Sequence, residues 1–126
     1  MIAPVTLDTM REVVDAFNRH DLDAIMSYFA DDAVFESPRG PDPRGTRYVG
    51  KDAVRVGLGK RFEGIPDVHY GDDDHFLSAD GLRGVSEWTL TGTTTGGERL
   101  EVRGCDIWTF QDGRIVVKDS YWKRVE

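Results

Sequence analysis

Cysteine, positive charge and long apolar runs are all scarce in this chain of 126 residues. Cys105 is the only cysteine, which excludes an intrachain disulfide and a zinc centre built from cysteines. The net charge of −7 argues against nucleic acid as a partner, because its phosphates would repel the chain. No apolar run approaches the ~20 residues of a membrane-spanning helix, and residues 1–4 lack the features of a signal peptide. We therefore expect a cytoplasmic protein without a membrane partner.

The length fits one domain, and we expect residues 1–126 to form it, because no linker, repeat or low-complexity segment interrupts them. The first third of the chain carries helical spacing. Apolar residues recur on one helical face over residues 7–17, with Thr6 as a candidate N-cap. A second apolar stripe covers residues 22–29 and begins after Asp21, which is the candidate cap of that helix.

The rest of the chain predicts one more helix and a sheet. Residues 33–36 read as a short strand, and residues 37–50 hold so many prolines and glycines that we expect no regular element there. A helix is expected over 51–62, and strands over 68–77 and 82–93, which are rich in β-branched and aromatic residues. This order predicts an α+β fold with helices on one face of a curved, mostly antiparallel sheet.

The most informative stretch is the end of the chain, where two β-rich runs flank the loop 111–113 and predict a hairpin. A three-residue loop would pair Asp106 with Lys118. Side-chain alternation then gives one face a mostly apolar set with a single carboxylate and a single ammonium: Val102, Asp106, Trp108, Phe110, Val116, Lys118 and Trp122. Such a face is typical of a small-molecule pocket with one polar centre.

The opposite face of the same hairpin is also largely apolar. It is predicted to hold Cys105, Ile107, Thr109, Ile115, Val117 and Tyr121. An apolar face on a solvent-facing sheet needs cover, so the pattern indicates an association through this face.

Four strings in this order resemble the SnoaL-like branch of the nuclear transport factor two superfamily. They are residues 16–23 (AFNRHDLD), 28–35 (YFADDAVF), 49–54 (VGKDAV) and the hairpin 102–122. The resemblance implies a cone-shaped, cystatin-like α+β roll, a homodimer packed sheet to sheet, and no cofactor. Members of this superfamily include ketosteroid isomerase, polyketide cyclases, epoxide hydrolases, dehydratases and non-catalytic domains, so the fold alone does not assign a function.

The ketosteroid isomerase mechanism can be checked position by position. It needs an Asp base and an oxyanion hole made of a Tyr and a protonated Asp. The second Asp falls at Asp106, but the base falls at Ser37 and the tyrosine falls near Val13, so we do not expect that mechanism. The resemblance also implies, from polyketide cyclases, an acid/base Asp on the last strand. Asp119 and Ser120 both remain candidates, because a one-residue register decides between them.

Asp106 and Lys118 are the candidate catalytic residues. Asp106 is either a cross-strand partner of Lys118 or an acid/base whose pKa is set by burial and by that lysine. Lys118 either neutralises the carboxylate or binds a ligand oxygen. The candidate ligand-binding residues are Trp88, Trp108, Trp122, Tyr28 and Ser37.

The three histidines lack the spacing of a metal site, so we expect none. His75 is either a surface strand residue or a general base. The expected function is acid/base chemistry, of isomerase, cyclase, hydrolase or dehydratase type, on a small, largely apolar, cyclic or carbonyl-bearing molecule. The alternative is a non-catalytic ligand-binding or dimerisation domain of the same fold.

Overall fold

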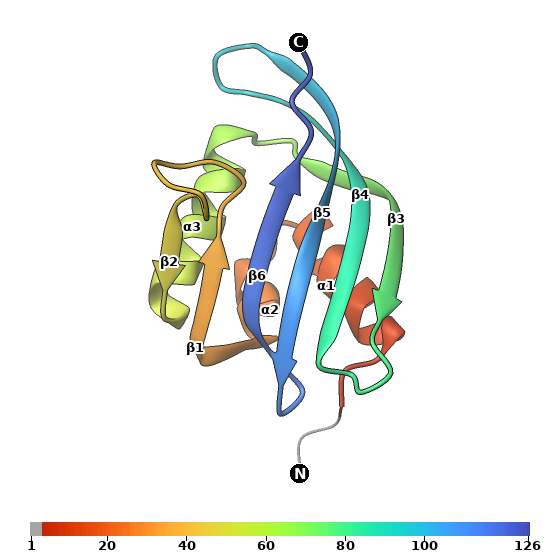
Figure 1. Ribbon diagram of the computed structural model, residues 1–126. Helices are drawn as coiled ribbons and strands as arrows, with labels where there is room; N and C mark the ends of the chain where they lie inside the picture. Colours follow the sequence, from red (N-terminus) through yellow and green to blue (C-terminus); the bar gives the residue numbers. More distant parts are fainter. Residues whose placement is uncertain (1–3) are drawn as a thin grey trace.

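Figure 1 shows the computed structural model, which describes residues 4–126 as a curved sheet with its helices gathered on one face. The elements in chain order are α1 (Leu7–Asn18), α2 (Leu22–Met26), β1 (Phe29–Glu36), β2 (Arg47–Val49), α3 (Lys51–Gly64), β3 (His69–Leu77), β4 (Arg83–Thr93), β5 (Arg99–Gln111) and β6 (Arg114–Trp122). The expected α+β architecture is confirmed.

The strand order is β2-β1-β6-β5-β4-β3. Neighbouring strands are antiparallel except β1 and β6, which run parallel. The helices cover the concave face, and in Figure 1 the convex face carries no helix. The interior of the cone lies between the helices and the concave face.

The N-terminal helices form as the sequence predicts at their starts. The Thr6 hydroxyl accepts from the Thr9 amide at 3.1 Å, and Asp21 caps α2 through the Ala24 amide at 3.1 Å. The end of α2 was predicted wrongly. This helix stops at Met26, and β1 begins at Phe29, so the strand expected over residues 33–36 starts four residues earlier.

The string 16–23 ties α1 to the sheet. Asn18 bonds the backbone of Tyr70 in both directions, accepting from its amide at 2.8 Å and donating to its carbonyl at 3.0 Å. His20 Nε2 lies 2.7 Å from the Val68 carbonyl oxygen. Two polar side chains therefore anchor the end of α1 beside β3, which gives this part of the family-like string a structural role.

The segment 37–50 contains a short strand that was not predicted. Residues Arg47–Val49 form β2 and pair with the end of β1. Tyr48 of this strand packs against α3 at Gly57, where a Cβ atom would lie 2.7 Å from the tyrosine ring. Gly57 is therefore required for close packing, although glycine is a poor helix former.

The final hairpin forms, but its predicted pairing was wrong. The turn holds only Asp112 and Gly113, both with positive φ (52° and 73°), as a two-residue hairpin turn requires. A bulge then follows, since Phe110 pairs with Ile115 and Thr109 pairs with Val117. As a result Ile115 is buried in the core rather than on the convex face, and the bulged Val116 leaves the predicted pocket face.

Candidate functional site

A buried ion pair lies at the centre of the concave face. The register places Asp106 opposite Ser120 and Lys118 opposite Trp108. Lys118 Nζ donates to Asp106 Oδ1 and to Ser120 Oγ, each at 2.7 Å, and the Ser120 hydroxyl donates to the same carboxylate oxygen. The Asp106 and Lys118 side chains are only 6% and 5% exposed. The two charges therefore meet in the interior, as predicted, although diagonally rather than as direct cross-strand partners.

Trp88 completes the set of donors to Asp106. Its Nε1 donates to Asp106 Oδ2 at 3.1 Å, so both carboxylate oxygens are bonded. Gly104 makes this possible, because it pairs with Trp88 across β4 and β5. A Cβ atom at Gly104 would lie 2.5 Å from Trp88 Cζ3. Gly104 was not among the predicted site residues, because an isolated glycine in a strand indicates a close approach without identifying the neighbour.

Aromatic rings surround the lysine ammonium. Nζ of Lys118 lies 4.9 Å from the centroid of Phe35, 5.4 Å from that of Phe17 and 5.6 Å from that of Trp108. Burial lowers the pKa of Lys118, and the Asp106 carboxylate opposes this shift. Two of the three ammonium protons are used by Asp106 and Ser120, so the third can serve another acceptor.

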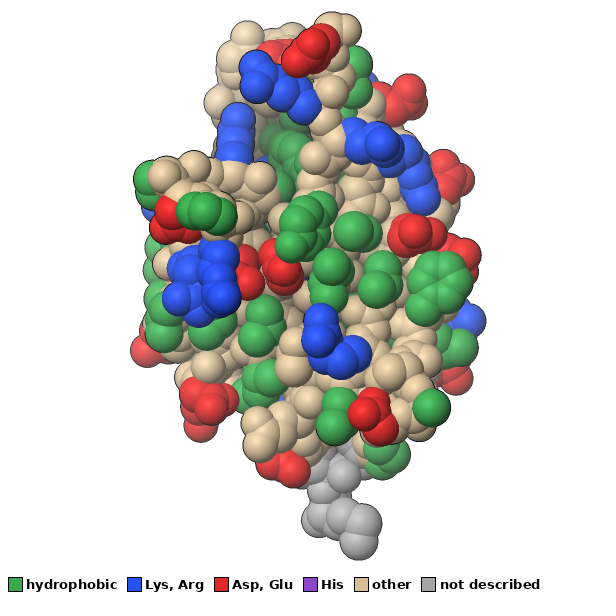
Figure 2. Space-filling model, in the orientation of Figure 1, with side chains coloured by type: hydrophobic (Ala, Val, Ile, Leu, Met, Phe, Trp, Pro, Cys, Tyr) green, Lys and Arg blue, Asp and Glu red, His purple; other side chains and the backbone are tan. Residues whose placement is uncertain are grey.

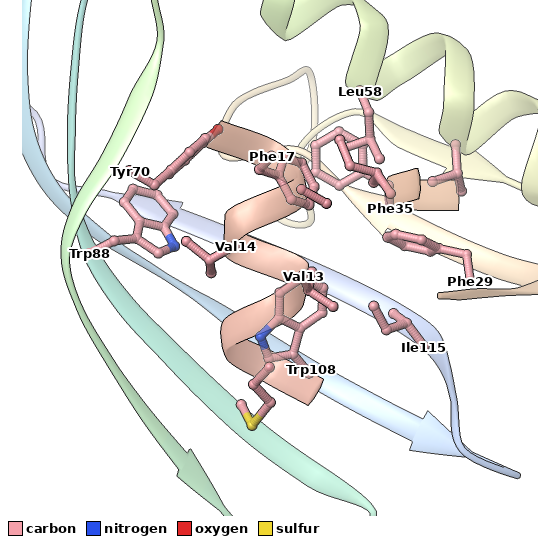
Figure 3. Close-up of a cluster of buried hydrophobic side chains, with 14 of the residues drawn as sticks. Val13, Val14, Phe17, Phe29, Phe35, Leu58, Tyr70, Trp88, Trp108 and Ile115 are labelled. Atoms are coloured by element: carbon pink, nitrogen blue, oxygen red, sulfur yellow. The ribbon is translucent and has the colours of Figure 1, made fainter. Parts of the chain in front are cut away.

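Figure 3 shows how this interior is walled. Phe17 and Val14 point inward from α1, Leu58 comes from α3, and the rings of Tyr70 and Trp88 lie together. The Tyr70 and Trp88 rings meet edge to face with centroids 4.9 Å apart. Burial raises the pKa of Tyr70 to about 12. A neutral phenol thus lines the same cavity as the Asp106–Lys118 pair.

Two small cavities flank the ion pair. One is lined by Asp106 and Lys118 with Tyr70 and other rings, and the second by Lys118 and Ser120. Each has a volume of only about 10 Å³, room for about one water molecule. The second cavity is bounded by Arg61 and Trp122, whose guanidinium and ring lie 4.2 Å apart. The Arg61–Trp122 stack therefore forms one side of this cavity.

The structure brings most of the predicted residues together. Trp88 and Trp108 are buried beside the ion pair, and Trp122 stands at its outer edge. Tyr28 does not join them: it lines another small cavity near the start of α1 and bonds Glu12 at 3.4 Å. Ser37 follows the end of β1 and lines neither of the two cavities; its amide is bonded to the Thr46 carbonyl.

The last strand resolves the choice between Asp119 and Ser120. Ser120 is buried and bonded to Asp106, as described above. Asp119 pairs with Ile107 and accepts a hydrogen bond from the Tyr121 hydroxyl at 3.0 Å. Asp119 therefore lies on the convex face, because neighbouring residues of a strand alternate between faces.

A second buried network lies on β3 and β4. His75 Nε2 is 2.7 Å from Asp73 Oδ2, His75 Nδ1 is 2.7 Å from Ser86 Oγ, and Trp108 Nε1 donates to Ser86 Oγ at 2.9 Å. A carboxylate only accepts, so the proton of a neutral ring lies on Nε2 and Ser86 donates to Nδ1. Both ring nitrogens are occupied, so this network serves to hold Trp108 in place.

Within residues 4–126 no group of three or more acidic, histidine or cysteine side chains is arranged to hold a metal ion. Across the same residues no helix is long and apolar enough to cross a membrane.

A curved sheet closed by helices around a polar centre is the architecture of the nuclear transport factor two-like and ketosteroid isomerase-like folds. The SnoaL-like domain family matches residues 10–118, and the chain therefore belongs to that family. No curated protein matches the chain.

Several solved structures share the fold. A proposed polyketide cyclase from Xanthomonas campestris pv. campestris is 22% identical, with a TM-score of 0.80 over 90% of this chain and 87% of its own. A proposed isomerase from Bacillus subtilis is 23% identical, with a TM-score of 0.77 over 92% and 84% of the two chains. A protein with a ketosteroid isomerase-like fold from Catenulispora acidiphila, in complex with trimethylamine, is 15% identical, with a TM-score of 0.78 over 93% and 86% of the two chains. At these identities the likeness shows the fold alone.

Proposed function

We propose that this chain binds a small, largely apolar, carbonyl-bearing compound inside the cone and catalyses proton transfer on it. The observation that carries the proposal is the Lys118 ammonium, which is buried among rings with one proton free of the Asp106 and Ser120 contacts. A buried ion pair contributes little to stability compared with apolar packing, so its presence favours a chemical role. A relative of the same fold forms a complex with trimethylamine, which supports small-molecule binding by such a cone.

The chemistry that fits this geometry is enolisation. Lys118 would donate a hydrogen bond to the carbonyl oxygen and stabilise the negative charge that develops there. The Asp106 carboxylate would take the proton as the adjacent C–H bond breaks, and would return it to the same or a neighbouring carbon. No redox partner is needed, and atoms and charge balance within the substrate and Asp106. The substrate would reach the pair by displacing the Arg61–Trp122 stack.

Exchange of the α-protons of cyclopentanone in D₂O, followed by proton NMR, tests this directly. The wild-type protein should accelerate exchange over buffer. The double variant Asp106→Asn, Lys118→Met should abolish the acceleration, while Asp119→Asn should retain it, because Asp119 lies on the convex face of the sheet. Equal exchange in the wild type and the double variant would refute the proposal.

A second function, a non-catalytic binding or dimerisation domain, is favoured by the filled interior. Each cavity beside the ion pair holds about one water molecule, at about 10 Å³. If this function is correct, the wild-type protein should not accelerate the exchange of ketone α-protons over buffer.

We also propose a homodimer that covers the convex face. Figure 2 shows hydrophobic side chains spread across this face between charged ones. Phe76 and Tyr121 are each 52% exposed, and Ile107 and Val117 are only partly buried. Sedimentation equilibrium at micromolar concentration should give the mass of two chains. Val117→Asp should give monomers or insoluble protein, whereas Val56→Asp, on the exposed side of α3, should remain dimeric. A well-behaved wild-type monomer would exclude the dimer.

A further inference from the structure

A large groove lies at the end of the sheet where β5 begins and β6 ends. Its volume is about 970 Å³. It lies between the start of β5 (residues 98–102), the chain around the end of β6 (residues 122–125), and Pro38 and Arg39. A groove of this size can hold a small molecule.

The groove is amphipathic. Leu100, Val102 and Trp122 give it apolar walls. Its charged side chains are four basic and two acidic, namely Arg39, Arg99, Lys123, Arg124, Glu98 and Glu101. Figure 2 shows basic side chains around this upper end of the molecule. A local excess of positive charge is unusual in a chain of net charge −7, and it favours an anionic ligand.

Most of these cations are available to a ligand. Arg99 is shared with Asp67 at 3.5 Å. Within residues 4–126, by contrast, the side chains of Arg39, Lys123 and Arg124 form no ion pair. Arginine recognises a carboxylate with two parallel hydrogen bonds, so Arg39 and Arg124 are suited to bind one.

Trp122 connects this groove to the interior. The same residue lines the groove and the small cavity that contains Lys118 and Ser120. Resting on the function proposed above, we infer that the groove binds the carboxylate end of an elongated amphipathic molecule. Its apolar end then passes Trp122 and reaches the interior. The ligand class is thus a medium-length organic acid rather than a neutral ketone alone.

Calorimetric titration with octanoate and its neutral analogue octanamide tests this inference. At low salt the wild-type protein should bind octanoate about tenfold more tightly than octanamide, as expected for two partly exposed ion pairs. The double variant Arg39→Glu, Arg124→Glu should lose this preference and keep its affinity for octanamide. The double variant Arg11→Glu, Arg55→Glu is the matched control: it makes the same charge change at exposed arginines of α1 and α3, outside the groove, and the preference should persist.

The outcomes separate the groove from the interior site. Equal affinity for the two probes in the wild type, no binding of octanoate, or a preference unchanged in the groove variant would each overturn the inference. The variant Asp106→Asn, Lys118→Met reports on the interior. If that variant loses both probes while the wild type shows no preference for the acid, the interior site stands and the groove inference falls. A groove-dependent preference that is indifferent to the interior variant would support the groove and count against the proposed function.

Discussion

Replacing Asp106 by Asn tests the buried ion pair most sharply, because the two side chains have the same shape. The charged Lys118 would still need an acceptor, so the amide oxygen of the variant must face Lys118 and its NH₂ group must face the Trp88 N–H. Two donors would then confront each other where Trp88 now donates to a carboxylate at 3.1 Å. Removing one member of a buried pair costs about 3–5 kcal/mol, which is a large share of the ~5–15 kcal/mol that stabilises a typical domain.

The second substitution, Lys118→Met, should restore most of this loss. With no ammonium to satisfy, the amide of Asn at position 106 can turn over. Its oxygen then accepts from Trp88, and its NH₂ group donates to Ser120. The double variant therefore has a neutral network in which each of these groups has a partner. Together with the single variant Lys118→Met, these two variants complete a double-mutant cycle, which measures the energy with which Asp106 and Lys118 are coupled.

Urea unfolding followed by tryptophan fluorescence, at fixed protein concentration, measures these free energies. The deficit of Asp106→Asn should also shrink as pH rises. Burial already lowers the pKa of Lys118, and without the carboxylate that opposes it the pKa falls further. A folded-state pKa below the unfolded value means that stability is regained as pH rises and the amine becomes neutral. An Asp106→Asn variant within about 1 kcal/mol of the wild type, or a double variant less stable than the single, would refute this reasoning.

Three further predictions concern the walls and the mouth of the site. Gly104→Ala should push Trp88 away from Asp106, since a Cβ atom there would lie 2.5 Å from Trp88 Cζ3. The tryptophan emission spectrum should shift and the free energy of unfolding should fall. An unchanged spectrum and an unchanged stability would contradict this prediction. Tyr70 should ionise near pH 12 in an ultraviolet titration. Because its pKa is raised on folding, the stability that it contributes below about pH 10 should be lost as the pH rises toward 12. The variant Tyr70→Phe should not show this loss. Amide hydrogen exchange should be faster in residues 37–46 than in β5, because this loop has few backbone hydrogen bonds. Strong protection of the loop would contradict this prediction.

The helices and the polar centre could be predicted from the sequence because both depend on local patterns. Thr6 and Asp21 are caps that act within one turn, and alternation placed Asp106 and Lys118 on one face. This placement survived a wrong register, since the shift was by two residues and two is the period of a strand. Ile115 lies between the turn and the bulge, where the shift is one residue, and a one-residue shift moves a side chain to the other face.

The remaining features depend on contacts between distant segments. A three-residue loop and a two-residue turn with a bulge fit the same residues, and packing of the core decides between them. The role of Gly104 appears only once Trp88 is across from it. The pairing of β1 with β6 joins residues about 85 apart along the chain, and no local pattern indicates it. The hairpin register, the role of Gly104 and the β1–β6 pairing therefore depend on which residues meet in the folded protein, and residue type alone does not indicate this.

The place of β6 in the sheet has a consequence for how the protein folds. Among residues 4–126 this strand is the one that joins the β1–β2 pair to the β5–β4–β3 sheet by hydrogen bonds, so the two parts cannot join until it docks. Lys118 and Ser120 both lie on β6, and Asp106, whose carboxylate they bind, lies on β5. Docking of β6 therefore closes the sheet and buries Lys118 together. A chain whose β6 is detached exposes the edges of β1 and β5, and these edges can pair wrongly with other chains.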